Sequence, residues 1–114
     1  MSHHRVIGAL VSLGLSETDA RIYMHLAAKG PQEAGLIAEA LKMPEDLLRK
    51  ALENLKDKGI VAYASKQSTL FSAISFNKAL DLLLKEHEKE TREMARSKDD
   101  TLSKWEAMIK GDPN

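Results

Sequence analysis

Cysteine is absent from the 114-residue sequence, which excludes a disulfide framework and a thiolate metal site and fits a reducing compartment. No apolar run approaches the roughly 18 residues that a membrane-spanning helix needs. The N-terminus has one short apolar patch at residues 6–13, interrupted by Gly8 and Ser12, and lacks the pattern of a signal peptide. These absences predict a cytoplasmic protein without membrane contact.

Net charge is missing as well, because 17 Lys and Arg residues oppose 17 Asp and Glu residues. Nucleic-acid-binding domains are usually basic, since neutralisation of phosphates supplies most of their affinity. Residues 1–76 hold nine basic and eight acidic residues, a net of +1, and residues 77–114 hold eight and nine, a net of −1. Any surface for nucleic acid must therefore be a local patch.

Catalytic and metal-binding patterns are also missing. The six glycines are scattered rather than gathered in a phosphate-binding loop, and there is no nucleophile elbow and no carboxylate pair with apolar flanks. The histidines, His3, His4, His25 and His87, do not have the His-x-x-x-His spacing of a zinc site. The sequence predicts neither an enzyme nor a metal or cofactor site.

The most informative pattern lies at residues 43–61, which predict one capped helix leading directly into a strand. Four apolar residues recur at the spacing of one buried helical face: Leu48, Ala51, Leu52 and Leu55. Five charged residues fall on the outward face: Glu45, Asp46, Arg49, Lys50 and Glu53. Pro44 suits the first helical turn, and Gly59 suits the left-handed residue that ends a helix.

Three more helices are predicted before this one. They are expected at residues 6–13, at 17–29 with Ser16 as the N-cap, and at 32–41. The link at residues 42–44 is so short that the helices on either side of it form a helix-turn-helix.

A hairpin is predicted from the β-prone segments 60–64 and 69–74, which the polar residues 65–68 separate. A helix-turn-helix followed by a hairpin is typical of a winged helix. The fold class is therefore predicted to be mainly α with a small β-hairpin, with a winged helix-turn-helix domain at residues 1–76.

Residues 77–114 predict a helical extension. Asn77 can cap a long charged helix, residues 97–100 predict a break in it, and residues 111–114 are expected to fray. A partly apolar seam at alternating steps of four and three predicts dimerisation through these residues: Leu80, Leu84, His87, Met94, Trp105 and Met108. The alternatives are that residues 80–84 only seal the core and that His87 is an ordinary surface histidine.

A DNA-binding face is predicted around the second helix of the helix-turn-helix. Its cations Arg49 and Lys50 can reach bases or phosphates, and Lys66 and Gln67 at the hairpin tip can reach an adjacent groove. Gln32 can donate to a phosphate from the start of the preceding helix. Residues 42–66 hold six basic and four acidic residues, a net of +2, so this region is only weakly basic for a DNA-binding surface.

Two carboxylates, Glu45 and Asp46, lie at the start of the same helix. They can accept hydrogen bonds from cytosine amino groups, but they also repel phosphates. The structural alternative is that acidic groups in a first helical turn are favoured by the macrodipole, by about 0.3–1 kcal/mol each.

Residues 13–23, Leu-Gly-Leu-Ser-Glu-Thr-Asp-Ala-Arg-Ile-Tyr, resemble the opening run of the TrmB-like family of archaeal transcription regulators. Further similarity occurs at residues 30–31, 37–38, 58–61 and 71–80 and at Leu48, Leu52 and Leu55. The resemblance implies an N-terminal winged helix-turn-helix that binds DNA. Larger members add a sugar-binding domain after this module, and we expect none here. The acidic Glu45 and Asp46 depart from the small polar and basic residues that the family commonly shows.

We therefore predict a DNA-binding transcription regulator that acts as a homodimer on double-stranded DNA in an archaeal-type cytosol. A dimer would place two helices in successive major grooves of a pseudo-palindromic site. The alternative is a winged helix that binds a protein of the transcription machinery, for which a neutral surface and an acidic helix would be suitable.

Overall fold

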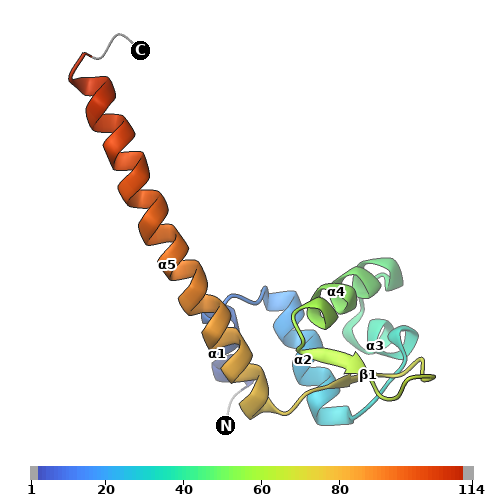
Figure 1. Cartoon of the computed structure of the whole chain (residues 1–114). Helices are drawn as coiled ribbons and strands as arrows, with labels where there is room; N and C mark the ends of the chain where they lie inside the picture. The colour runs from blue at the N-terminus through green and yellow to red at the C-terminus, as the bar shows by residue number, and fades with distance from the viewer. Residues whose placement is uncertain (1–2, 112–114) are drawn as a thin grey trace. The chain divides into compact units, whose positions relative to one another are not determined.

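The computed structural model describes residues 3–111, which form five helices and one two-stranded sheet. In chain order these elements are α1 (His3–Ser12), α2 (Glu17–Lys29), α3 (Ala34–Leu41), α4 (Glu45–Asp57), β1 (Val61–Tyr63), β2 (Phe71–Ala73) and α5 (Phe76–Ile109) (Figure 1). The mainly helical fold class with a β-hairpin is confirmed. Fraying was expected at residues 111–114. Of these, residues 112–114 lie outside the described part of the chain.

Contacts divide the chain into two compact units, which we call the N-terminal unit, ending at Leu84, and the C-terminal unit, beginning at Lys85. The helix α5 supplies residues to both units. The domain boundary predicted after residue 76 stays a prediction.

The caps of α2 and α4 follow from the sequence. The hydroxyl of Ser16 accepts a hydrogen bond from the backbone N–H of Asp19 (3.0 Å), which confirms Ser16 as the N-cap of α2. At the end of α4, Ile60 N donates to Leu55 O (3.0 Å) and Gly59 N to Lys56 O (3.0 Å). With Gly59 at φ +79°, this is a Schellman motif, and it confirms the predicted left-handed stop.

Three local expectations were wrong. Pro44 is the N-cap of α4, with ψ 137°, and not part of its first turn. Asn77 does not cap α5, which begins at Phe76, because Ser75 Oγ accepts from Lys78 N (3.3 Å). The break expected at residues 97–100 does not occur, since this polar segment contains no Pro or Gly and Asp100 pairs with Lys104 one turn later (3.1 Å).

The hairpin is short and antiparallel. Val61 pairs with Ala73 and Tyr63 with Phe71. Phe71 also forms a bridge to Gln32, with Gln32 N donating to Phe71 O (3.0 Å) and Phe71 N to Gln32 O (2.8 Å). A single β-bridge therefore ties the segment before α3 to the end of the hairpin strands that lies next to the loop.

The core lies in the N-terminal unit and collects residues from every element of that unit. Leu48, Leu52 and Leu55 of α4 are fully buried and Ala51 is partly buried, which confirms the predicted apolar face. The α3 and α4 helices contact each other, and α4 also contacts α2 and β1. From α5, Ala79 and Leu83 complete the core. No helix within residues 3–111 is both long and apolar enough to cross a membrane.

Candidate nucleic-acid interface

The helices α3 and α4 meet at a tight turn. Lys42 takes the left-handed conformation (φ 56°, ψ 47°) at the end of α3, and Met43 N donates to Ala38 O (2.9 Å). Because only two residues, Met43 and Pro44, separate Lys42 from the start of α4 at Glu45, the turn fixes the angle between the two helices. These elements are a helix-turn-helix.

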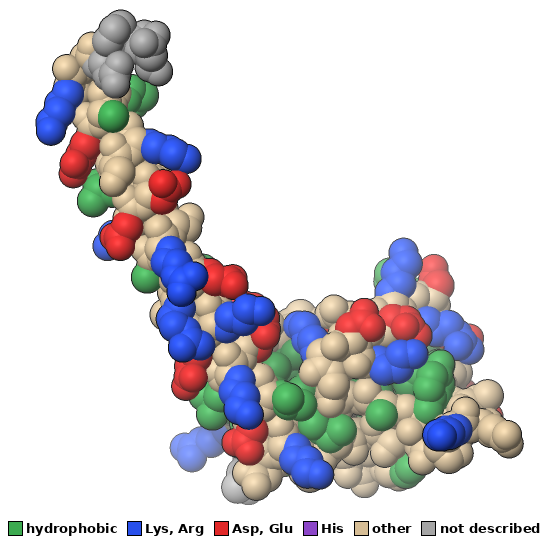
Figure 2. All heavy atoms as spheres, in the orientation of Figure 1, with side chains coloured by type: hydrophobic (Ala, Val, Ile, Leu, Met, Phe, Trp, Pro, Cys, Tyr) green, Lys and Arg blue, Asp and Glu red, His purple; other side chains and the backbone are tan. Residues whose placement is uncertain are grey.

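The outward face of α4 carries charges of both signs. The five residues predicted to face outward are exposed: Glu45, Asp46, Arg49, Lys50 and Glu53. On the face of the N-terminal unit that Figure 2 shows, acidic and basic side chains are interspersed rather than gathered into one basic patch. Two of the cations on α4 are paired with carboxylates of the same helix, so fewer of its cations are free to contact phosphates.

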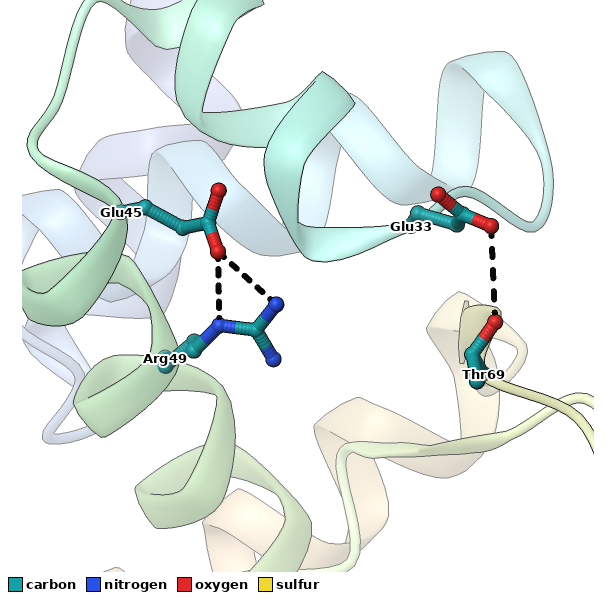
Figure 3. A network of polar contacts seen from close by, with 4 residues as sticks. All are labelled: Glu33, Glu45, Arg49 and Thr69. Carbon is teal, nitrogen blue, oxygen red and sulfur yellow. Dashed lines mark hydrogen bonds and ion pairs between the residues drawn. The ribbon is translucent and has the colours of Figure 1, made fainter.

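The first of these pairs joins Arg49 to Glu45. Arg49 Nε donates a hydrogen bond to Glu45 Oε2 (2.9 Å), and Arg49 Nη2 forms an ion pair with the same oxygen (2.8 Å) (Figure 3). The side chains stay 59% and 51% exposed. Surface pairs of this spacing stabilise a helix by only about 0.3–0.5 kcal/mol, so the main effect of this pair is on the orientation of Arg49.

The second pair joins Lys56 to Glu53, with the Lys56 side chain partly buried. Its Nζ lies 3.5 Å from Glu53 Oε1 and 4.7 Å from the centre of the Tyr63 ring, which in turn packs against Phe71 with ring centres 4.9 Å apart. Lys56 therefore links α4 to the hairpin as a cation–π contact. Lys50 differs from it, since no ion pair involves Lys50 within residues 3–111.

The hairpin tip presents Lys66 and Gln67 as exposed residues. Its base is closed by Ala64 N donating to Leu70 O (2.9 Å). Thr69 Oγ1 lies 3.5 Å from Glu33 Oε1, a contact between the hairpin and the N-cap residue of α3 that Figure 3 also shows. The loop of the hairpin is thus in contact with the start of the helix-turn-helix.

The sequence predicted Gln32 at the start of a helix, and this is wrong. Gln32 is half-buried in the bridge to Phe71, because two backbone hydrogen bonds hold it extended, and α3 begins only at Ala34. Its side-chain Oε1 lies 2.7 Å from His25 Nε2. Contact of Gln32 with a phosphate stays a prediction that depends on its remaining amide N–H groups.

The predicted dimer residues fall into two groups. Leu80 is partly buried against the core, and Leu84 is exposed. His87, Met94, Trp105 and Met108 belong to the C-terminal unit, in which every residue of the described range 85–111 is exposed. From α5, the buried residues Ala79 and Leu83 therefore close the core, and Leu80 contributes in part.

Sequence reasoning missed a partly buried polar contact between α2 and α4. Asp19 on α2 is 7% exposed, and its Oδ2 lies 3.3 Å from Asn54 Nδ2 on α4. The two residues are 35 positions apart, so no local pattern signals their contact. Among the side chains that the structure describes, no group of three or more His, Cys, Asp or Glu is placed to hold a metal ion.

A helix-turn-helix followed at once by a hairpin that packs on its second helix defines a winged helix. Solved structures that are similar to this chain include proteins described as transcriptional regulators. Residues 10–77 match the family described as "Sugar-specific transcriptional regulator TrmB". The chain belongs to this family. A comparison with curated protein sequences found no match.

Solved structures share the fold at low sequence identity. The archaeal chromatin protein TrmBL2, whose structure is described as showing a novel mode of DNA binding, is 18% identical, with a TM-score of 0.73 over 96% of this chain and 42% of its own. This chain thus spans less than half of the length of TrmBL2. A possible transcriptional regulator from Methanosarcina mazei Go1 is 14% identical (TM-score 0.57, 84% and 83% covered). YusO from Bacillus subtilis is 15% identical (TM-score 0.53, 95% and 82% covered).

Proposed function

We propose that this protein is a transcription regulator that binds double-stranded DNA in the cytosol, with α4 as its recognition helix in the major groove. The observation that carries the proposal is the outward face of α4, where Arg49 and Lys50 are exposed in the first half of the helix. In helix-turn-helix proteins, this half of the recognition helix contacts the base edges. Membership of a transcription-regulator family supports the same function.

The hairpin acts as the wing in this proposal. Lys66 and Gln67 at its tip contact the sugar-phosphate backbone beside the groove that α4 enters. The bridge between Gln32 and Phe71 and the contact between Lys56 and Tyr63 support this role, because they connect the strands of the wing to the segment before α3 and to α4.

We also propose that the regulator is a homodimer formed through α5. Five large apolar side chains of the C-terminal unit are between 49% and 70% exposed: Met94, Leu102, Trp105, Met108 and Ile109. Their spacing puts them on one side of the helix, as in the seam of a coiled coil. A second copy of α5 is the partner that this stripe fits, since two copies would bury it mutually.

Selection from a random duplex library at low and at physiological salt tests the DNA-binding proposal. Replacing Arg49 and Lys50 with Ala should weaken binding to the selected duplex and lower the salt slope by up to about two per protomer, and Lys66→Ala should lower it by about one. Lys104→Ala on α5 is the matched control and should change neither. Absence of binding by the wild type at low salt would refute DNA binding.

One observation favours a second candidate function, the binding of a protein of the transcription machinery. Leu36 on α3 and Leu47 on α4 are 55% and 52% exposed, next to the acidic start of α4. An apolar contact with an acidic rim suits a protein partner more than a phosphate backbone. Its affinity would depend little on salt, whereas DNA binding weakens steeply as salt rises.

A further inference from the structure

The contacts between Glu45 and Arg49 leave one particular edge of the guanidinium free. Arg49 Nε donates to Glu45 Oε2 (2.9 Å), and Nη2 forms an ion pair with the same oxygen (2.8 Å), so one N–H on each of these nitrogens faces the carboxylate. An arginine has five N–H groups, so three remain. Two of these, one on Nη1 and the second on Nη2, point in parallel from the end of the side chain, and in Figure 3 Nη1 is directed away from Glu45.

The other oxygen of Glu45 lies close to α3. This oxygen, Oε1, lies against Gly35 in the first turn of α3, so close that a Cβ at residue 35 would be only 3.2 Å from it. A carboxylate at the N-terminus of a helix is favoured by the helix dipole. The carboxylate of Glu45 therefore lies between the start of α3 and the guanidinium of Arg49, and it orients that guanidinium relative to both helices.

The free edge of Arg49 has the geometry that guanine requires. In the major groove guanine presents two adjacent acceptors, O6 and N7, and two parallel N–H donors of one arginine match them; this is the commonest specific contact in protein–DNA complexes. Arg49 is the fifth residue of α4, in the half of the helix that reaches bases, and its side chain is 59% exposed.

We infer that Arg49 reads a guanine in each half-site and that Glu45 is a positioning residue that holds Arg49 for this contact without touching DNA. The inference rests on the proposed function and adds the base that is read. It gives Glu45 a role in a DNA-binding helix that differs from the acceptance of cytosine amino groups. It also requires one G·C pair at a fixed place in each half of the selected site.

The test is a double-mutant cycle on the full chain, using the selected duplex and derivatives in which single G·C pairs are exchanged for A·T. The proteins are wild type, Glu45→Ala, Arg49→Ala and the double variant. Glu53→Ala is the matched control, because it removes the same charge from an ion pair on the same helix. Circular dichroism checks that each variant is folded.

At one pair, the wild type should prefer G·C by about 5- to 150-fold, and Arg49→Ala should lose this preference. Glu45→Ala should lose most of it at the same pair, and the double variant should behave as Arg49→Ala does. Glu53→Ala should keep it. Replacing that guanine with 7-deazaguanine, which lacks N7, should weaken binding of the wild type and leave binding of Arg49→Ala unchanged.

Two further variants separate positioning from charge. Glu45→Gln keeps an oxygen that can accept from Nε and Nη2, so it should retain part of the preference that Glu45→Ala loses. Gly35→Ala leaves both charges in place but pushes the Glu45 carboxylate by a few tenths of an ångström, and it should reduce the preference without changing the salt slope.

The outcomes that overturn the inference are distinct from failure of the proposed function. Losses that add independently in the double variant, or that affect different base pairs, would show that Glu45 contacts DNA itself. A full preference in Glu45→Ala would show that the ion pair has no role in recognition. In either case DNA binding would stand, whereas wild type that binds no duplex at low salt would overturn both proposals.

Discussion

The phenol of Tyr23 on α2 donates a hydrogen bond of 2.7 Å to the backbone carbonyl of Ile74, the residue that follows β2. The Tyr23 ring also packs near that of Phe76, with centres 6.4 Å apart. Tyr23 is 1% exposed, so the bond is made where water cannot replace it readily. This contact fixes where the chain leaves the wing and enters α5.

Removing this hydroxyl should destabilise the N-terminal unit. Tyr23→Phe keeps the ring in the core but leaves the Ile74 carbonyl without its donor, and we expect a loss of about 1 kcal/mol in the free energy of unfolding. Tyr63→Phe is the control, since Tyr63 is 44% exposed and its hydroxyl makes no hydrogen bond within residues 3–111; it should change stability by less than about 0.5 kcal/mol. Urea denaturation of the three proteins at pH 7 measures this, and equal stabilities would contradict it.

Alkaline pH should destabilise the protein through the same residue. Burial raises the pKa of Tyr23 above its ordinary value of 10.0, and the hydrogen bond that the neutral phenol donates acts in the same direction. A raised folded-state pKa means that the stabilisation is complete below pH 10 and is lost as pH rises through the pKa of the folded state. The free energy of unfolding should then fall by up to about 1.4 kcal/mol per pH unit from this group alone.

The Tyr23→Phe variant isolates this effect from the titration of lysines in the same range. Urea titrations between pH 8 and 11 should show a shallower fall above pH 10 for Tyr23→Phe than for wild type. Tyr63→Phe should follow the wild type. Parallel curves for all three proteins would mean that the pKa of Tyr23 is not changed by folding.

A side chain at Gly59, just after the end of α4, should destabilise the protein. A Cβ there would meet only Leu82 Cδ1, at an ordinary 3.5 Å, so the penalty comes from the backbone, with φ at +79°. Gly59→Ala should cost about 1–2 kcal/mol in stability. Gly8→Ala, in the middle of α1 with open space around it, should be neutral or should stabilise by up to about 1 kcal/mol. Thermal unfolding compares the pair, and a stabilising Gly59→Ala would refute the argument.

The proposed dimer should depend on one side of α5. Exchanging Leu102 and Trp105 for Glu puts charges into the exposed apolar stripe, and we expect dissociation to monomer at micromolar concentration. Ser103 and Ala107, each two residues from Trp105, lie on the opposite side of the helix. The same two charges at these positions should leave the dimer intact. Sedimentation velocity distinguishes the species, and a wild-type monomer at high micromolar concentration would refute the dimer.

Features that depend on neighbours in sequence were predictable. The apolar face of α4, the Ser16 cap and the Gly59 stop each follow from residues within two turns of one another, and all three are confirmed. The ion pair between Glu45 and Arg49 was also within reach, since its i, i+4 spacing is a known signal. The N-cap of α5 was harder to predict from the sequence, because Ser75 and Asn77 are both good N-cap residues and lie only two positions apart.

Features that depend on distant residues were not predictable. Gln32 pairs with Phe71, and Asp19 contacts Asn54, only because the core brings their elements together. The local pattern at Gln32 favoured a helix, but the two hydrogen bonds to Phe71 outweigh that preference. For the candidate interface, the sequence indicated which residues are exposed, whereas the orientation of Arg49 required the carboxylate of Glu45 and its contact with Gly35.

The internal pairing of cations on α4 has a consequence for how such a regulator would search a genome. Arg49 and Lys56 are each partnered by a carboxylate, so fewer unpaired charges remain to attract random phosphates. A genome offers on the order of 10⁶ to 10⁹ competing sites, and non-specific retention on them depletes the free protein. On the proposed function, weak retention leaves a larger share of the molecules free to find the operator. Fewer copies of the protein would then be needed to keep the operator occupied.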